Sequence, residues 1–354
     1  MEQSAYLKKL LESEIKEVLG CTEPASVAFA FARAVKIFKD KYSRGQLRSD
    51  FKAEVTVSRD VFRNISTVRV PVVKLKGIAP AASCGIYTKA AGFNPFSGIA
   101  AAEKRKIGQL LRRKNWLKVA VRNVDGIFVD ARIKGGGEEA RVVVEGSHDN
   151  IKAAYFNGRK ISQRKAAVRY KLKSMDEVLS IVRRRDKGLE DIAEKFLVNQ
   201  GKLYEQFRYT DAFEAVSGLV EKRMDGASLR VITVTGSGNQ GIFIGIPFYR
   251  LYKKRGGKIL PAALFSLLSQ IYLTHGKGRI SSDCGLAAKA SAALVGGLSF
   301  LQNFNMKKIT ANMDFTQKAL KGLLCEGAEP VCAMKARLAL TAVKNIVCPK
   351  GELL

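Results

Sequence analysis

The chain has 354 residues, 47% of them hydrophobic, which is enough for more than one buried core. Its 61 Lys and Arg outnumber its 32 Asp and Glu, so the formal net charge is +29. No apolar run approaches the roughly 18 residues of a membrane span, and the N-terminal segment is charged and amphipathic, unlike a secretory signal. We therefore expect a cytoplasmic protein with no membrane partner.

The first 50 residues predict two helices. Apolar residues recur at helical spacing over 5–19, and Gly20 is a typical helix stop. Thr22, Glu23 and Pro24 then predict the start of a second helix that runs to about residue 42. Thr can cap a helix, and Pro suits a first turn because its missing N–H costs nothing there.

From about 51 to 172 the apolar period changes to two, which predicts strands. The strands are expected at 51–57, 66–75, 117–124, 126–133, 139–146 and 150–156. A helix over 97–113 interrupts them. We predict a β-rich α+β domain over 51–174, built from antiparallel hairpins.

From about 175 onward the pattern is helical again. Helices are expected at 175–198, 203–224, 258–275, 284–302, 308–323 and 331–346, with a glycine-rich break at 235–247. The predicted fold class is therefore α+β, with the β-rich middle domain joined to a mainly helical domain over 175–354. The helices within 1–50 are expected to pack on the helical domain.

Three of the six cysteines occur near predicted helix ends. Cys284 follows Ser282 and Asp283, either of which can cap a helix, while Cys325 and Cys332 flank a Gly–Pro break. Thiolates near helix N-termini are stabilised by the helix dipole and by free N–H groups. These cysteines could hold a cubane iron–sulfur cluster. They could equally be small buried residues, since their spacing is not of the CxxC type.

Other candidate residues are Cys21, the loop 236–241 and the two histidines. Cys21 precedes the second helix, where its thiol should be acidified and could act as a base or nucleophile, or have no chemistry. The loop 236–241 contains three glycines and could form a nest of N–H groups for a carboxylate, or a plain turn. His148 lies on a polar loop that can reach a cleft, whereas His275 ends a helix and is interpreted as structural.

Five motifs in this order resemble the L-cysteine desulfidase group, which is related to the serine dehydratase α chain. They are GCTEP at 20–24, SHDNI at 147–151, GSGNQG at 236–241, DCG at 283–285 and CEGAEPVCAMK at 325–335. The resemblance covers nearly the whole chain. It implies a lyase with a 4Fe–4S cluster that converts L-cysteine to pyruvate, ammonia and sulfide. The same chemistry on L-serine, with loss of water, is the alternative.

The resemblance also implies roles for individual residues. Cys284, Cys325 and Cys332 would hold the cluster and leave one iron open as a Lewis acid. Cys21 would remove the α-proton, and His148 would be a second catalytic residue. The residues expected to bind substrate are Thr22, Glu23, Asn150, Ser237 and Asn239.

A second class of function is a catalytically degenerate basic protein that binds RNA or an acidic partner. The cations are spread over 104–118, 183–187 and 249–258, and acidic or apolar residues interrupt them. No RNA-binding motif or zinc-finger spacing accompanies them. We therefore do not expect a nucleic-acid partner despite the charge of +29. The expected partner is a small amino acid, and the sequence leaves a homo-oligomer open.

Overall fold

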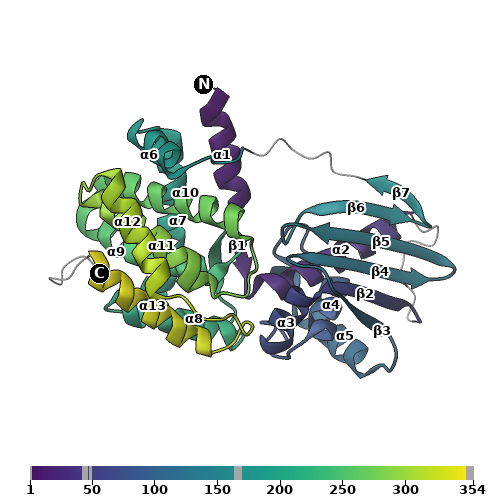
Figure 1. The fold of residues 1–354 in the computed structure, drawn as a ribbon. Coiled ribbons are helices and arrows are strands. Elements are labelled where there is room, and N and C mark those ends of the chain that lie inside the picture. Colours follow the sequence, from purple (N-terminus) through teal and green to yellow (C-terminus); the bar gives the residue numbers. More distant parts are fainter. Residues whose placement is uncertain (1, 42–46, 48–49, 163–169, 348–354) are drawn as a thin grey trace.

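The computed structural model describes residues 2–41, 47, 50–162 and 170–347. Figure 1 shows two parts, a β-rich part and a helical part. The β-rich part contains strands β2 to β7 and helices α2 to α5. The helical part contains α1, β1 and the elements from α6 onward. The predicted α+β class is confirmed.

The β-rich part is built on one sheet with the strand order β3-β2-β4-β5-β6-β7 among the described residues. The strands are β2 (Lys52–Ser58), β3 (Leu117–Arg122), β4 (Phe128–Gly135), β5 (Glu138–Glu145), β6 (Ile151–Phe156) and β7 (Arg159–Ser162). The pairs from β2–β4 to β6–β7 are antiparallel, as expected for hairpins. The pair β2–β3 is parallel, because three helices connect these two strands.

Helices cover one face of this sheet (Figure 1). Helix α2 (Thr22–Lys41) packs on β4 and β5 and on α4 (Ile78–Tyr87), and α5 (Ala101–Arg112) packs on α4. The apolar residues of α2, such as Val27 and Phe31, are fully buried there. The expectation that both N-terminal helices pack on the helical part is therefore wrong for α2, while α1 (Glu2–Glu14) packs on α7.

Two local predictions are wrong. Residues 66–75 do not form a strand, because α3 (Arg59–Thr67) runs into them and turns follow. The helix predicted over 5–19 ends at Glu14, and Ile15–Leu19 forms strand β1 instead. Strand β1 pairs antiparallel with β8 (Arg230–Val234), so a partner more than 200 residues away overrides the local helical period.

The helical part packs around α9 (Gly238–Arg255), α10 (Leu260–Lys277) and α11 (Ser291–Leu301). The outer helices are α6 (Met175–Arg183), α7 (Lys187–Gln206), α8 (Ala212–Met224), α12 (Met306–Ala319) and α13 (Val331–Val347). A π-helical turn, η3 (Leu286–Ala290), precedes α11. The predicted break at 235–247 ends early, because the Ser237 side chain caps α9 at its first turn.

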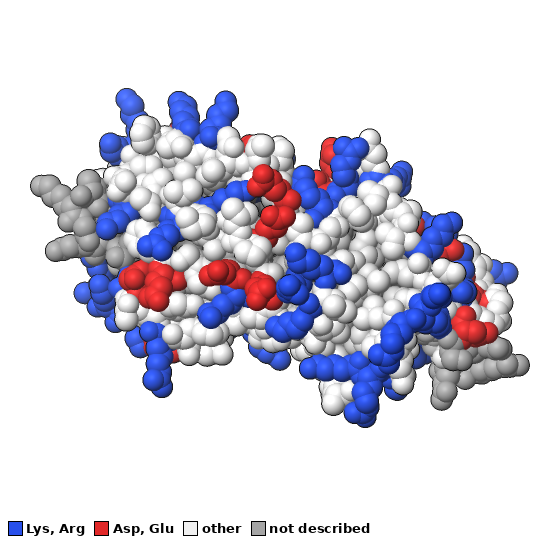
Figure 2. Space-filling model, turned by 90° about the horizontal axis from the view of Figure 1, so that it is seen from below, with Lys and Arg blue, Asp and Glu red and all other residues white. Residues whose placement is uncertain are grey.

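Among the described residues, one helical stretch, Gly238–Lys277, is long and apolar enough to cross a membrane. Within it, 78% of the most apolar window is buried inside the protein, as in the core helix of a globular fold. Most charged residues lie on the surface, but a few, such as Glu14, Arg223 and Lys289, are buried. On the face shown in Figure 2, basic side chains are spread over the whole molecule, and acidic side chains lie among them.

Candidate active site

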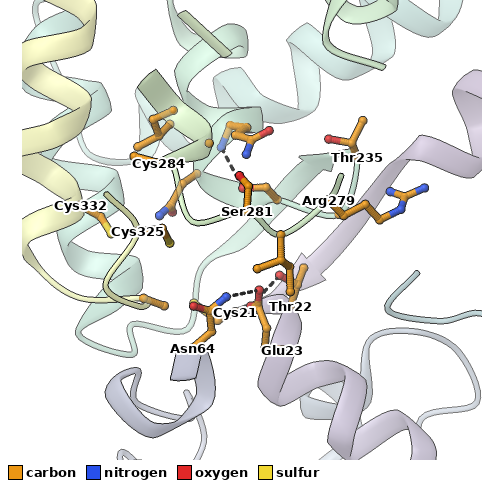
Figure 3. Close-up of a pocket in the computed structure, with 18 of the residues that line it drawn as sticks. Cys21, Thr22, Glu23, Asn64, Thr235, Arg279, Ser281, Cys284, Cys325 and Cys332 are labelled. Carbon is orange, nitrogen blue, oxygen red and sulfur yellow. Dashed lines mark hydrogen bonds between the residues drawn. The ribbon is translucent and has the colours of Figure 1, made fainter. Parts of the chain in front are cut away.

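A cavity of about 110 Å³ lies where the β-rich and helical parts meet. Nine of the ten residues predicted from the sequence line it: Cys21, Thr22, Glu23, His148, Ser237, Asn239, Cys284, Cys325 and Cys332. Figure 3 shows Cys284, Cys325 and Cys332 on one side of the site and Cys21, Thr22 and Glu23 on another. Residues spread over more than 300 positions of sequence therefore share one site.

Backbone contacts position the three cysteines. Asp283 and Leu324 form an isolated antiparallel bridge, and the Cys284 and Cys325 N–H groups donate across it, each over 2.7 Å. Cys332 lies in the first turn of α13, as predicted, whereas Cys284, expected in the first turn of a helix, lies one residue before the helix that begins at Gly285. Cys325 lies in a loop rather than at a helix end, because α12 already stops at Ala319.

Burial outweighs the nearby donors and cations, so the pKa values of the Cys325 and Cys332 thiols are raised overall. Burial raises the pKa of the Cys325 and Cys332 thiols, but backbone N–H groups of Gly327 and Glu329 act in the opposite direction. The cations Lys289 and Lys335 also interact electrostatically with Cys284 and its neighbours. Such donors and cations stabilise thiolates and the sulfurs of an anionic cluster.

This donor set fits an iron–sulfur cluster. Three buried or partly buried cysteines from two segments line one cavity. Within the described ranges, no three His, Cys, Asp or Glu side chains converge closely enough to hold a single metal ion. Thiolates that each bind a different iron of a cluster do not need to converge on one point.

Cys21 lies at the turn between β1 and α2 and is 1% exposed. Gly20 reaches this turn with φ +76°, so the chain reverses immediately before the cysteine. The expectation that the thiol is acidified is wrong: burial raises its pKa to about 12, and the cation of Arg223 only partly offsets this. The helix N-terminus does not outweigh the loss of water around the sulfur.

Glu23 forms a polar group with its neighbours at the start of α2. Its carboxylate accepts hydrogen bonds from Thr22 Oγ1 and from Asn64 Nδ2, each over 3.0 Å (Figure 3). His148 Nε2 lies 3.7 Å from Glu23 Oε1. Burial raises the pKa of Glu23, but His148 and Asn64 outweigh burial and lower it to about 2. Glu23 is therefore a buried carboxylate that stays ionised.

His148 is 4% exposed, and neither ring nitrogen has a hydrogen-bond partner among the described residues. Ser26 of α2 donates to its backbone carbonyl over 2.8 Å and fixes the loop. Gly236 lies against the ring, so that a Cβ added there would be 2.6 Å from Nδ1. A buried imidazole that lines a cavity beside an ionised carboxylate, with neither nitrogen hydrogen-bonded among the described residues, is suited to contact a ligand.

The loop before α9 brings Ser237 and Asn239 to the cavity. Gly236 has φ +83°, and the Ser237 side chain accepts from the Gln240 N–H at the start of α9. Asn239 Oδ1 accepts from Arg223 Nη1 over 2.7 Å. The predicted glycine-rich loop therefore lines the cavity at a helix N-terminus, where an anion is favoured.

Asn150 does not line the cavity, which corrects its predicted substrate contact. Its side-chain amide donates to the Glu145 carbonyl over 2.8 Å and closes the loop that carries His148. Cys84 is fully buried on α4 and is not among the lining residues. Cys348 lies outside the described residues.

Several charged or polar residues of the cavity were not predicted as site residues, among them Asn64, Arg223, Arg279 and Lys289. Arg279 makes two hydrogen bonds to the Glu14 carboxylate, of 2.8 and 2.6 Å. Lys289 is 1% exposed and donates to the Gly278 carbonyl over 2.7 Å. No sequence signal marks these residues, because long-range packing alone brings them to the site.

The sequence profile of the serine dehydratase alpha chain family matches residues 98–348. The chain belongs to this family. The matched region contains His148, Ser237, Asn239 and the three cysteines that flank the cavity, but begins after Cys21. The family indicates a lyase-type enzyme of amino-acid catabolism and is generally associated with iron–sulfur clusters.

Individual relatives of the chain are UPF0597 proteins. The protein of Thermosipho africanus is 27% identical, over 98% of this chain and 91% of the relative. That of Clostridium tetani is 25% identical, over 99% and 91%. That of Parabacteroides distasonis is 25% identical, over 92% and 83%. The similarity to the first two relatives, which covers 98% and 99% of this chain, therefore includes the N-terminal segment with Cys21, which the family profile does not reach.

Proposed function

We propose that this protein is an iron–sulfur-dependent lyase of the cytoplasm that eliminates sulfide and ammonia from L-cysteine to give pyruvate. One observation carries the proposal: Cys284, Cys325 and Cys332 line the same cavity as Cys21, Glu23 and His148. A set of thiols suited to a 4Fe–4S cluster thus lies beside groups that can move protons. When bound, such a cluster supplies a Lewis acid that polarises the leaving group.

In this proposal the side chains of the cavity carry out the proton chemistry. Cys21 Sγ accepts the α-proton, the Cα–H and Cβ–S bonds break, and a Cα=Cβ double bond forms as sulfide leaves. The resulting 2-aminoacrylate tautomerises to an imine, which water hydrolyses to pyruvate and ammonia. Because burial raises the pKa of Cys21 to about 12, the thiolate that accepts the proton is a minor form at neutral pH.

The polar residues bind and orient the substrate. Glu23, ionised and held by Thr22 and Asn64, attracts the substrate ammonium group. The loop that contains Ser237 and Asn239 lies at the N-terminus of α9, where it stabilises the negative charge of the substrate carboxylate. His148, whose Nε2 lies 3.7 Å from Glu23 Oε1, contacts the substrate with its ring nitrogens, neither of which makes a hydrogen bond among the described residues.

L-Serine is a second candidate substrate, because the matching family is that of the serine dehydratase alpha chain. The reaction has the same steps, but water leaves in place of sulfide. Hydroxide is a poorer leaving group than hydrosulfide. The departing oxygen of L-serine therefore needs more stabilisation than the departing sulfur of L-cysteine.

The experiment is anaerobic purification followed by assays of both substrates. We expect a coloured protein that contains iron and sulfide in equal amounts and releases pyruvate from L-cysteine together with sulfide. Faster release of pyruvate from L-serine would assign the second substrate. A colourless, iron-free protein that is inactive after anaerobic reconstitution would contradict both lyase assignments. Salt-sensitive co-purification of nucleic acid would then favour a binding protein.

A further inference from the structure

Arg223 is a buried cation that joins two of the motifs at the cavity. It lies at the end of α8 and is 3% exposed. Its Nε donates to the Gly20 carbonyl over 3.1 Å, and its Nη1 donates to Asn239 Oδ1 over 2.7 Å. A Cβ added at Gly238 would lie 2.7 Å from its guanidinium carbon, so the backbone of α9 packs directly against it.

Arg223 lacks a counter-charge. In the ranges that the structure describes, no carboxylate lies within 4.0 Å of its guanidinium, whereas Arg279 in the same cavity is paired with Glu14. A guanidinium has five N–H donors, and the two hydrogen bonds to Gly20 and Asn239 leave three unused. A buried cation without an anion is costly, and an anionic ligand in the cavity would remove that cost.

We propose that Arg223 binds the α-carboxylate of the substrate and makes the site specific for amino acids with a free carboxylate. This inference rests on the proposed function, since it names the part of the substrate that the site recognises. The planar fork of a guanidinium matches a carboxylate, which can accept two hydrogen bonds from it.

The surrounding charges give the substrate one orientation. Glu23 is an ionised carboxylate, so it repels the substrate carboxylate and attracts the ammonium group. Arg223 interacts electrostatically with Cys21, so a carboxylate held by Arg223 brings the adjacent Cα toward that cysteine. The β-substituent then remains free to face the side of the cavity with Cys284 and Cys332.

The test measures binding of two ligands that cannot undergo elimination, L-alanine and L-alaninamide, which lacks the carboxylate. Calorimetry is done anaerobically on the cluster-containing wild type and on R223Q. We expect wild type to prefer L-alanine by about 30-fold or more, the usual effect of a buried charged hydrogen bond. R223Q should bind both ligands with similar affinity.

Two further variants separate recognition from a merely structural role. K222Q changes an exposed cation one position earlier on α8 and should keep the wild-type preference. G238A keeps the arginine but places a methyl group 2.7 Å from both its guanidinium and Val231 Cγ2, so it should lower the preference even if R223Q does not fold.

The outcomes distinguish this inference from the proposed function. A wild type that does not prefer L-alanine, or an R223Q or G238A variant that keeps the preference, would overturn the role of Arg223 even if L-cysteine is converted to pyruvate. A wild type that shows the Arg223-dependent preference but no turnover would support the carboxylate site and contradict the lyase.

Discussion

Asp283 and Leu324 pair through their backbones as an isolated antiparallel bridge, and the residue after each is a cysteine of the proposed cluster site. The Cys284 N–H donates to the Leu323 carbonyl and the Cys325 N–H to the Ser282 carbonyl. Because these are main-chain bonds, the geometry of the two segments does not depend on the sulfur atoms. Variants that lose a sulfur should therefore keep the local fold.

The first prediction follows from this bridge. C325S should fold with wild-type circular dichroism but lose the visible absorption and the iron and sulfide of the cluster, because a hydroxyl is a poor iron ligand. C84A is the matched control, since Cys84 is equally free of disulfide but buried on α4 outside the cavity. It should keep the cluster and lose about 1 kcal/mol of stability. A C325S protein with full iron content would argue against Cys325 as a ligand.

The second prediction concerns Cys21. C21S should lower kcat at least about 100-fold, the usual contribution of a positioned acid–base group, and keep the cluster absorption. In wild type, kcat/KM for L-cysteine should rise with pH through the neutral range, because burial raises the pKa of the Cys21 thiol to about 12 and only the thiolate accepts a proton. Loss of iron from C21S would instead identify Cys21 as a cluster ligand.

The third prediction compares two glycines with positive φ. Gly236 (φ +83°) has His148 against it, whereas Gly126 (φ +72°) has nothing within 4 Å of an added Cβ. G236A and G126A should each lose about 1–2 kcal/mol of stability, since alanine is strained in that conformation. Only G236A should also reduce turnover, because its methyl group displaces the His148 ring. Equal activity of the two variants would show that the position of His148 is unimportant.

The fourth prediction concerns acid stability. Burial raises the pKa of Glu14, but hydrogen bonds and charges from His275 and Arg279 outweigh burial and lower it from 4.5 to about 2. A carboxyl with a lowered native pKa stabilises the fold above its unfolded value of 4.5, and this stabilisation is lost as the pH falls toward 2. The full effect corresponds to about 3 kcal/mol.

The measurement is urea unfolding of cluster-free wild type and E14Q at pH 7 and pH 3. The stability advantage of wild type over E14Q should shrink by more than half between the two pH values, because glutamine does not titrate. An advantage that is the same at both pH values would show that the pKa of Glu14 is the same in the native and unfolded states.

Elements with a strong local period could be predicted from the sequence. Strands β3 to β6 alternate between turn residues, and α12 and α13 have regular apolar faces. Strand β1 could not be predicted, because its apolar residues fit a helix and only the distant β8 makes it a strand. The strand predicted over 66–75 is absent for the opposite reason. Its β-branched residues alternate as in a strand, but the segment continues from α3 and has no partner strand.

The residues of the site also divide into those that could be predicted from the sequence and those that could not. Short motifs with unusual chemistry, such as the cysteines and the glycine loop, stand out in the sequence and meet in the cavity. Asn64 and Arg223 do not stand out, because an asparagine on a helix and an arginine on another are ordinary surface residues until the fold buries them. The acidity of Cys21 could not be predicted either, since it depends on how completely the β-rich and helical parts exclude water from the sulfur.

The positions of the proposed ligands along the chain set an order of events during synthesis. Strands β2 to β7 are complete by residue 162, whereas Cys284, Cys325 and Cys332 are made much later. The sheet, with α2 and its Cys21 packed on it, can therefore fold on the ribosome before any ligand of the cluster exists. Under the proposed function, iron therefore enters a site of which one wall has already folded, and cluster delivery belongs to the last stage of the maturation of this protein.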